Sequence, residues 1–316
     1  MFQSEIAYST TWLIFFTNFA QTFIQYHNTT AVSRINQEIV EYSFSSKSTL
    51  SYELSLLVGA DSVYYMVNDA QLNILALKSF HFDLKKEKSP IENLKSVFFE
   101  DYLLKEAYRT TKIVLTTPHF TLVPTKFYNE KESITYLKNL TNLEESDFIS
   151  ADSLKNQSFK NVFTADQQLV NFIQTIFPQS KTHHIFTALI EGFQKLAELR
   201  QGHQIFANVR DGFVQILFFD GKDLVFANAY AFRTAQDLVY YLMLVYEQFK
   251  LNPETIPLSI SGFLTEDSDI YKYIFRYIRH VNFIQAPLYL RFGNQFTGIP
   301  QHFYFDVFSI KLLSEI

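Results

Sequence analysis

One pattern of strands and turns occurs twice in this chain of 316 residues. Residues 52–82 contain three strand-like stretches separated by tight turns, and a helical stretch and the apolar strand 113–115 follow them. Residues 203–232 repeat this order, and a helix and the apolar strand 256–261 follow again. Apolar and polar side chains that alternate indicate strands, and strands that alternate with helices indicate an α/β architecture. The repetition therefore predicts two copies of one folding unit.

The composition is that of a globular protein large enough for two domains, with 47% apolar and 19% charged residues. A net charge of −5 does not provide the basic face that nucleic-acid binding demands. The absence of cysteine excludes disulfides, thiolate nucleophiles and zinc–thiolate sites, and it fits a reducing compartment. We therefore expect a cytoplasmic protein that does not bind nucleic acid.

Residues 1–45 differ from the rest of the chain. Aromatic side chains recur at helical spacing over residues 12–26, which predicts an amphipathic helix. Polar residues interrupt the apolar run and make it too polar and too short to span a bilayer. A helix that lies on a membrane surface usually carries Lys or Arg on its polar face, and residues 12–26 contain neither. We expect a helical or poorly ordered extension, with membrane contact through residues 12–26 as the weaker alternative.

The polar segment 144–160 is the expected junction between the two copies. On this division, residues 46–160 form a first lobe, and residues 161–316 form a second lobe together with the C-terminal segment. Within the second lobe, Thr234 followed by Asp237 is the arrangement of a capping box, which predicts that a helix begins at this point.

Several short motifs in a fixed order give the chain a resemblance to a known family. They are Phe177-Pro178, His183-His184, Asn208-Val209-Arg210-Asp211-Gly212, Phe226-Ala227-Asn228, Thr234-Ala235-Gln236-Asp237, Tyr240-Tyr241 and Pro300-Gln301-His302-Phe303-Tyr304. In this order they resemble the bacterial domain of unknown function 3822, found in Bacteroidetes, over residues 45–316. The resemblance implies an actin-like ATPase fold, that is, two tandem ribonuclease-H-like α/β lobes with mixed sheets and flanking helices. The plan is also distantly similar to pilus-assembly and cell-division actin-like proteins.

The actin-like resemblance implies a nucleotide site between the lobes, built on an Asp-x-Gly turn at the end of the first strand of each copy. The carboxylate orients the water shell of Mg²⁺, and glycine lets backbone N–H groups approach the phosphates. In the first copy Gly59 stands at the position of the carboxylate, and Asp61 with Ser62 fits only if the register shifts by two residues. In the second copy Asn208 replaces the Asp, and Arg210 replaces the Gly.

A third part of such sites, the turn that contacts adenosine, normally carries two or three glycines, and Ser261-Gly262-Phe263 keeps one. Asp211-Gly212 suits the type I′ turn of a hairpin, which we favour over a role in phosphate binding. Arg210 offers one new contact, because a guanidinium can pair with a phosphate. The candidate residues of this degenerate nucleotide cleft are Asp61, Ser62, Asn208, Arg210, Asp211, Gly212 and Gly262.

The other candidate sites offer no recognisable chemistry. The adjacent His183 and His184 would point to opposite faces of a strand, which is wrong for chelating one metal ion, so we expect structural roles. Lys272 and Arg276, interleaved with tyrosines, have the composition of a base-stacking surface, but on a helix such residues more often form a solvated face over buried rings. We expect neither a metal site nor a catalytic residue.

These observations predict a non-catalytic scaffold or regulatory module that binds an unknown protein partner and uses no cofactor. The reason is that the duplicated fold is retained while its phosphate loops are eroded. The alternative is a nucleotide-binding ATPase or sugar-kinase-like enzyme that uses ATP with Mg²⁺ at Asp61, Asp211 and Gly262. A total of only 8 glycines argues against this alternative, because phosphate loops are rich in glycine.

Overall fold

The computed structural model describes residues 34–82, 90–138, 140–141, 143, 147–210 and 212–314. The aromatic stretch 12–26 and Asp211 therefore lie outside the described residues. Within the described part of the chain the strands form three sheets, and none of the helices combines the length and the apolarity needed to cross a bilayer.

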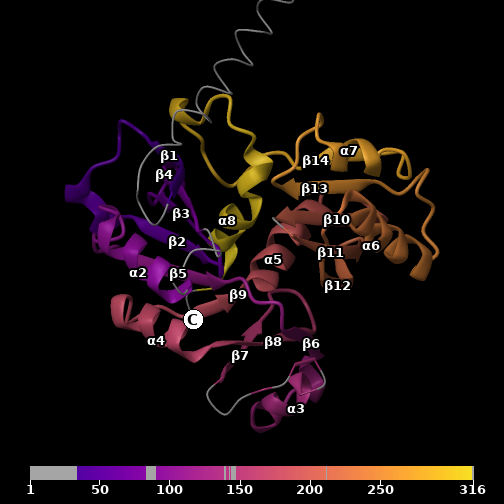
Figure 1. The fold of residues 1–316 in the computed structure, drawn as a ribbon, viewed down its shortest axis with the longest axis horizontal. Helices are drawn as coiled ribbons and strands as arrows, with labels where there is room; N and C mark the ends of the chain where they lie inside the picture. The colour runs from indigo at the N-terminus through magenta and orange to yellow at the C-terminus, as the bar shows by residue number, and fades with distance from the viewer. Residues whose placement is uncertain are drawn as a thin grey trace, which may run out of the picture.

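The two large sheets repeat one order of strands (Figure 1). The first sheet runs β1 (Arg34–Val40), β4 (Ile74–His81), β3 (Ser62–Asn68), β2 (Glu53–Val58), β5 (Thr110–Leu115) and β9 (Thr182–His184). The second runs β12 (Asp223–Ala231), β11 (Phe213–Asp220), β10 (His203–Arg210), β13 (Leu258–Gly262) and β14 (Val281–Phe283). In each copy, three successive strands form an antiparallel meander, and the first of them also pairs in parallel with the strand after a crossover helix. The predicted duplication and the mixed α/β class are confirmed.

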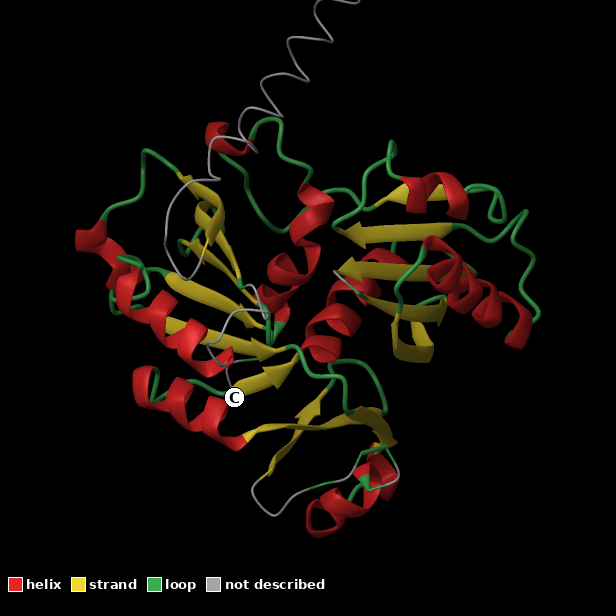
Figure 2. Cartoon of the chain, in the orientation of Figure 1, coloured by secondary structure: helices red, strands yellow, loops and turns green. Residues whose placement is uncertain are grey.

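Helices cover the outer faces of both sheets, and two more lie between the sheets (Figures 1 and 2). The outer helices are α2 (Pro90–Glu100) and α4 (Gln167–Ile176) on the first sheet, and α6 (Ala235–Gln248) and α7 (Asp269–Ile274) on the second. The inner helices are α5 (Ile185–Ala197) and α8 (Phe305–Ser309). A smaller sheet of β6 (Phe120–Pro124), β8 (Phe159–Asp166) and β7 (Asp147–Ser153) packs with α3 (Ser133–Leu137). The 3-10 helices are η1 (Ser46–Ser51), η2 (Thr125–Phe127), η3 (Glu130–Glu132), η4 (Asn294–Phe296), η5 (Gln301–Tyr304) and η6 (Ile310–Leu312).

Local sequence explains the central strands and the start of α6. Strand β2 is buried at every position, as expected for a strand in a sheet that is covered on both faces. At the start of α6, Thr234 Oγ1 accepts the Asp237 N–H at 3.1 Å, and the Asp237 carboxylate accepts the Thr234 N–H at 3.0 Å. These two bonds satisfy N–H groups that a helix leaves unpaired at its first turn. The predicted capping box is confirmed.

Two segments pair differently from the sequence-based expectation. Residues 34–40, expected in a helical or poorly ordered extension, form β1 and pair antiparallel with β4. An edge strand is held mainly by backbone hydrogen bonds on one side, so its side-chain pattern is weak. Residues 182–184, assigned to the second lobe, form β9 and pair in parallel with β5 at the edge of the first sheet. Strand pairing therefore changes from the first lobe to the second across α5 and not at residues 144–160.

A central hydrophobic cluster joins the two lobes. It combines residues of β3 and β4 from the first sheet, of β10 and β11 from the second, and of α5 and α8 between them. Phe193 of α5 stacks on Phe206 and on Phe305, at 4.8 Å and 5.0 Å between ring centroids. Gly192 lets α5 approach α8, because an added Cβ would lie 2.1 Å from Ser309 Oγ. The facing sides of the two sheets therefore share one packed core.

Candidate functional site between the lobes

The residues predicted to line the nucleotide cleft fall into two groups. Asn208 and Arg210 lie in the last part of β10, and Gly262 ends the neighbouring parallel strand β13. Asp61 and Ser62 lie in the first lobe, at the turn between β2 and β3. Asn208 and Arg210 belong to one polar network, Gly262 lies beside it at the end of β13, and the other two residues lie in a local turn.

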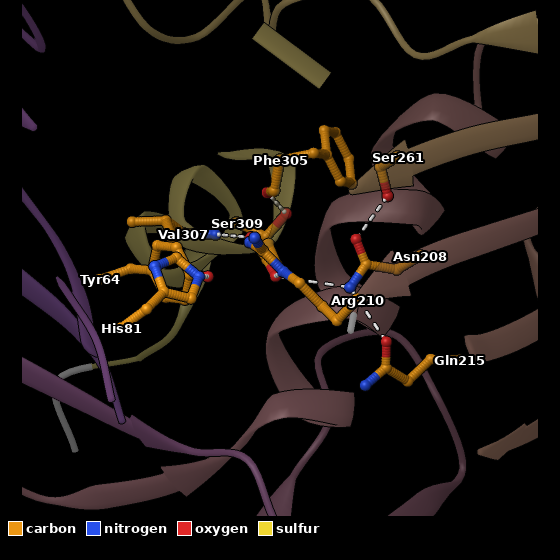
Figure 3. Close-up of polar contacts among 10 residues, drawn as sticks. Tyr64, His81, Asn208, Arg210, Gln215, Ser261, Phe305, Val307 and Ser309 are labelled. Atoms are coloured by element: carbon orange, nitrogen blue, oxygen red, sulfur yellow. Dashed lines mark hydrogen bonds and ion pairs between the residues drawn. The ribbon is translucent and has the colours of Figure 1, made fainter. Parts of the chain in front are cut away.

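Arg210 is at the centre of this network and is already paired. Its Nε donates to Asp306 Oδ2 at 2.8 Å and its Nη2 donates to Asp306 Oδ1, so the two side chains form a bidentate ion pair. The guanidinium carbon also lies 4.4 Å from the ring centroids of Tyr64 and of Phe263. Figure 3 shows Arg210 extending from the second lobe to Tyr64 of the first, beside α8. One cation therefore connects both lobes to the C-terminal segment.

The ion pair is shielded from water. The side chain of Asp306 is 1% exposed, and that of Arg210 is 13% exposed. Burial opposes the charge on Arg210, but the attraction of the Asp306 carboxylate outweighs it and raises the pKa of the guanidinium. Burial also raises the pKa of Tyr64, and it raises the pKa of Tyr304 to about 12. At neutral pH the guanidinium is therefore a cation and both phenols are neutral.

Asn208 is fully buried, and both ends of its amide are bonded (Figure 3). Its Nδ2 donates to Gln215 Oε1 at 3.0 Å and lies 3.4 Å from Asp306 Oδ2. Its Oδ1 accepts from Ser261 Oγ at 2.8 Å. Leaving a buried polar group without partners costs about 1–3 kcal/mol, so these bonds matter for stability. Asn208, which the family resemblance implied at the position of a metal-binding Asp, is thus committed to internal bonds.

Backbone geometry alone accounts for Gly262. Its φ is +90°, and an added Cβ would lie 1.9 Å from the carbonyl oxygen of Val209. The Phe263 N–H donates to the same carbonyl at 2.8 Å. This close turn carries the Phe263 ring that packs on Arg210.

Asp61 and Ser62 bond to each other in the turn that follows β2. Ser62 Oγ donates to Asp61 Oδ1 at 2.9 Å, and the Gly59 N–H donates to the Ser62 carbonyl at 2.8 Å. Gly212 has a φ of +76°, which fits the expected hairpin turn between β10 and β11. Its neighbour Asp211 lies outside the described residues.

The contacts of Arg210 with Asp306 and Tyr64 were not predicted from the sequence. Asp306 is 96 positions away along the chain, so no local pattern links the two residues. One signal was available: Asp306 stands inside the apolar run 303–310, and a buried acid in such a run requires a base or hydrogen-bond donors. The Tyr64 hydroxyl and His81 Nε2 lie 2.5 Å apart beside the pair. These residues belong to strands β3 and β4, and nothing in the local sequence indicates that they are near Arg210.

His183 and His184 have separate partners. His183 Nδ1 lies 2.9 Å from Asp152 Oδ1, whereas the ring of His184 bonds to the Thr117 carbonyl at 3.0 Å and to Asn161 Nδ2 at 3.1 Å. Burial lowers the pKa of His184 to about 4, against smaller upward effects of Thr117 and Asp152. Among the described residues, no three His, Asp or Glu side chains gather in an arrangement that could hold a metal ion.

Comparisons with known proteins confirm the fold. The sequence model of a family described as protein of unknown function (DUF3822) matches residues 41–281. A crystal structure from Bacteroides thetaiotaomicron, of a protein with actin-like ATPase fold and unknown function, shows 23% identity and a TM-score of 0.71, covering 76% of this chain and 93% of that chain. The PilM–PilN type IV pilus biogenesis complex shows 9% identity and a TM-score of 0.57, covering 82% of this chain and 97% of that chain. A search of curated proteins finds no match.

Proposed function

The chain belongs to the family of proteins of unknown function DUF3822, and we propose that it is a non-catalytic scaffold or regulatory module that binds a protein partner. In this proposal the cleft between its actin-like lobes is a degenerate nucleotide site, occupied by the chain's own charges. The observation that carries the proposal is the ion pair of Arg210 with Asp306, enclosed by the rings of Tyr64 and Phe263.

A nucleoside triphosphate would have to break this ion pair before it could use Arg210. Removing one partner from a buried ion pair costs about 3–5 kcal/mol, because the other charge is left without compensation. The released Asp306 carboxylate would then face the phosphates, and like charges at close range repel. Asn208 is committed to Gln215 and Ser261, so its side chain is not free to bind the metal ion of Mg-ATP. This balance disfavours Mg-ATP, and the proposed function uses no cofactor.

A fixed two-lobed body suits a binding scaffold, because a surface that is already ordered loses less entropy when a partner binds. The shared central cluster and the Arg210–Asp306 pair both hold the lobes together. The similar PilM structure is a complex of two proteins, which supports a protein partner for this chain.

Titration with Mg-ATP separates this proposal from a nucleotide-binding ATPase or kinase-like enzyme. We expect no rise in Tm at millimolar Mg-ATP and no release of phosphate. Asp211→Ala is the test variant. Asp220→Ala is its matched control, because Asp220-Gly221 forms the next Asp-Gly turn along the chain. The proposal fails if Mg-ATP raises the Tm by several degrees in the wild type and in Asp220→Ala but not in Asp211→Ala.

The proposed binding of a protein partner needs a separate experiment. Affinity purification from the native cell would identify a candidate partner, which is then purified and mixed with the purified chain. We expect a stable complex in the absence of nucleotide. A complex that forms only when Mg-ATP is added would contradict the proposed cofactor-free scaffold.

A further inference from the structure

We propose that a cavity in the first lobe binds a small organic anion that carries an aromatic or aliphatic group. The cavity, of about 570 Å³, lies at the amino ends of β5 and β9, beside the last turns of α2 and α4. Strands β5 and β9 run toward the centre of the molecule (Figure 1), so their amino ends are at the edge of the sheet that faces away from the central site. This site goes beyond the scaffold role and does not depend on it.

His183 is a buried polar residue that lines this cavity. Its side chain is only 6% exposed. Nδ1 is bonded to Asp152 Oδ1 at 2.9 Å, and Asp152 Oδ2 accepts from the His184 N–H at 2.9 Å and from the Thr187 hydroxyl at 2.7 Å. These bonds to a fully buried carboxylate fix the orientation of the imidazole. Within the described part of the chain His183 Nε2 makes no hydrogen bond, so it is available to a ligand.

Basic side chains give the cavity a positive potential. Lys105 and Arg109 line it and are exposed, and neither forms an ion pair among the described residues. Lys112 also lines it and lies 3.5 Å from the buried carboxylate of Glu53, which it shares with Lys311. Among the described residues that line the cavity, Glu106 is the acidic one. A concave surface with an excess of positive charge concentrates anions.

Aromatic rings form the apolar part of the wall. Phe98 of α2 and Phe177 after α4 pack edge to face, with 5.8 Å between ring centroids, and the neighbouring Phe99 is 67% exposed. The volume falls within the range of about 300–1,000 Å³ that is typical of small-molecule sites. The rings would contact the apolar part of a ligand, and Arg109 would bond its phosphate or carboxylate. Because Nδ1–H of His183 already donates to Asp152, Nε2 would donate to the anion with His183 as an imidazolium.

Isothermal titration calorimetry of the full chain with three probes tests the ligand class. Phenyl phosphate carries a ring and a phosphate, benzoate carries a ring and a carboxylate, and inorganic phosphate carries no ring. We expect phenyl phosphate or benzoate to bind at least about tenfold more tightly than inorganic phosphate. The tighter of the two identifies the anionic group. The proposal is wrong if no probe binds at millimolar concentration, or if inorganic phosphate binds as tightly as both aromatic probes.

Variants locate the site. Arg109→Gln changes an exposed side chain and should weaken binding of the tighter aromatic probe by about tenfold. His183→Asn places an amide nitrogen near the position of Nδ1, which retains the bond to Asp152 and removes Nε2. It should weaken binding by a similar factor. Arg279→Gln, exposed on the second lobe, is the matched control and should bind like the wild type.

Unchanged affinity in Arg109→Gln would overturn the proposal, and this variant provides the test even if His183→Asn does not fold. Equal weakening in Arg279→Gln would also overturn it, because the effect would then follow from net charge alone.

Discussion

Two ion pairs attach the same C-terminal segment, residues 305–312, to the two lobes. In the second lobe Arg210 binds Asp306 of α8, and in the first lobe Glu53 binds Lys311 of η6 at 2.6 Å. The acid of each pair is buried, since the side chains of Asp306 and Glu53 are 1% and 0% exposed. Figure 2 shows the helices of this segment between the lobes, so each pair acts on the junction of the molecule.

The two pairs differ in redundancy. Glu53 has a second cation, Lys112, at 3.5 Å, so the loss of Lys311 leaves it paired. Arg210 has no second carboxylate among the described ion pairs, and aromatic rings cover its guanidinium. Of the two pairs, Arg210–Asp306 is therefore the one that tolerates least change.

Asp306→Ala should have the largest effect. It leaves the guanidinium of Arg210 buried without a counter-charge, which should lower the free energy of unfolding by about 3–5 kcal/mol in urea denaturation. The double variant Arg210→Met/Asp306→Leu should recover most of the loss, because well-packed apolar residues can replace a buried ion pair. If the double variant is as unstable as Asp306→Ala, the unpaired charge is not the cause.

His184 provides a comparison with the buried ion pairs, because burial lowers its pKa and so favours its neutral form. Its pKa is about 4 in the folded chain and 6.5 in the unfolded chain, so between these values the unfolded state binds more protons. Its contribution should raise the free energy of unfolding by about 3 kcal/mol as pH rises from 4 to 6.5 and should be constant above 6.5. The slope of stability against pH in this window should therefore be smaller in His184→Gln. Parallel slopes for the wild type and the variant would contradict the assignment.

Gly192→Ala tests the packing that brings α8 and its Asp306 to the junction. The new Cβ would lie 2.1 Å from Ser309 Oγ and 2.9 Å from Ser309 Cβ, so α5 and α8 would have to separate. Overpacking of this kind should cost about 2 kcal/mol of unfolding free energy, measured by urea denaturation. Gly59→Ala is the control, because its added Cβ would lie 3.3 Å from the nearest atom, the side-chain oxygen of Ser62. A loss in the control as large as in Gly192→Ala would show that helix separation is not responsible.

The fold was predictable where its cause is local. The apolar residues of 53–58 predicted a strand, which the structure shows buried at every position, and the Thr234–Asp237 cap lies within one helical turn. The motifs used for family resemblance are short as well, and they led to the actin-like fold that the comparisons confirm. Strand β1 was missed because an edge strand needs few buried side chains. Of the β1 residues whose burial is described, 37–40, Ile39 is the buried one.

The candidate site was predictable only in part. The family resemblance drew attention to Asn208, Arg210 and Gly262, and the structure places these residues at the adjacent ends of β10 and β13. The partner of Arg210 could not be predicted, because the bond to Asp306 depends on the path of the C-terminal segment back between the lobes. Arg210 was therefore predicted as a possible phosphate ligand, whereas the structure shows its guanidinium bound to a carboxylate of the same chain.

Lys311→Met should have the smallest effect and is the sharpest test of redundancy. Glu53 would keep Lys112 at 3.5 Å, and the side chain of Lys311 is 18% exposed, so water compensates for part of the loss. We expect a decrease of about 1 kcal/mol in the free energy of unfolding. Lys195→Met removes an exposed lysine that pairs with Glu198, and as the control it should change stability by less than about 0.5 kcal/mol. A loss in Lys311→Met as large as that in Asp306→Ala would mean that Lys112 does not replace Lys311, and the two anchors would then be equivalent.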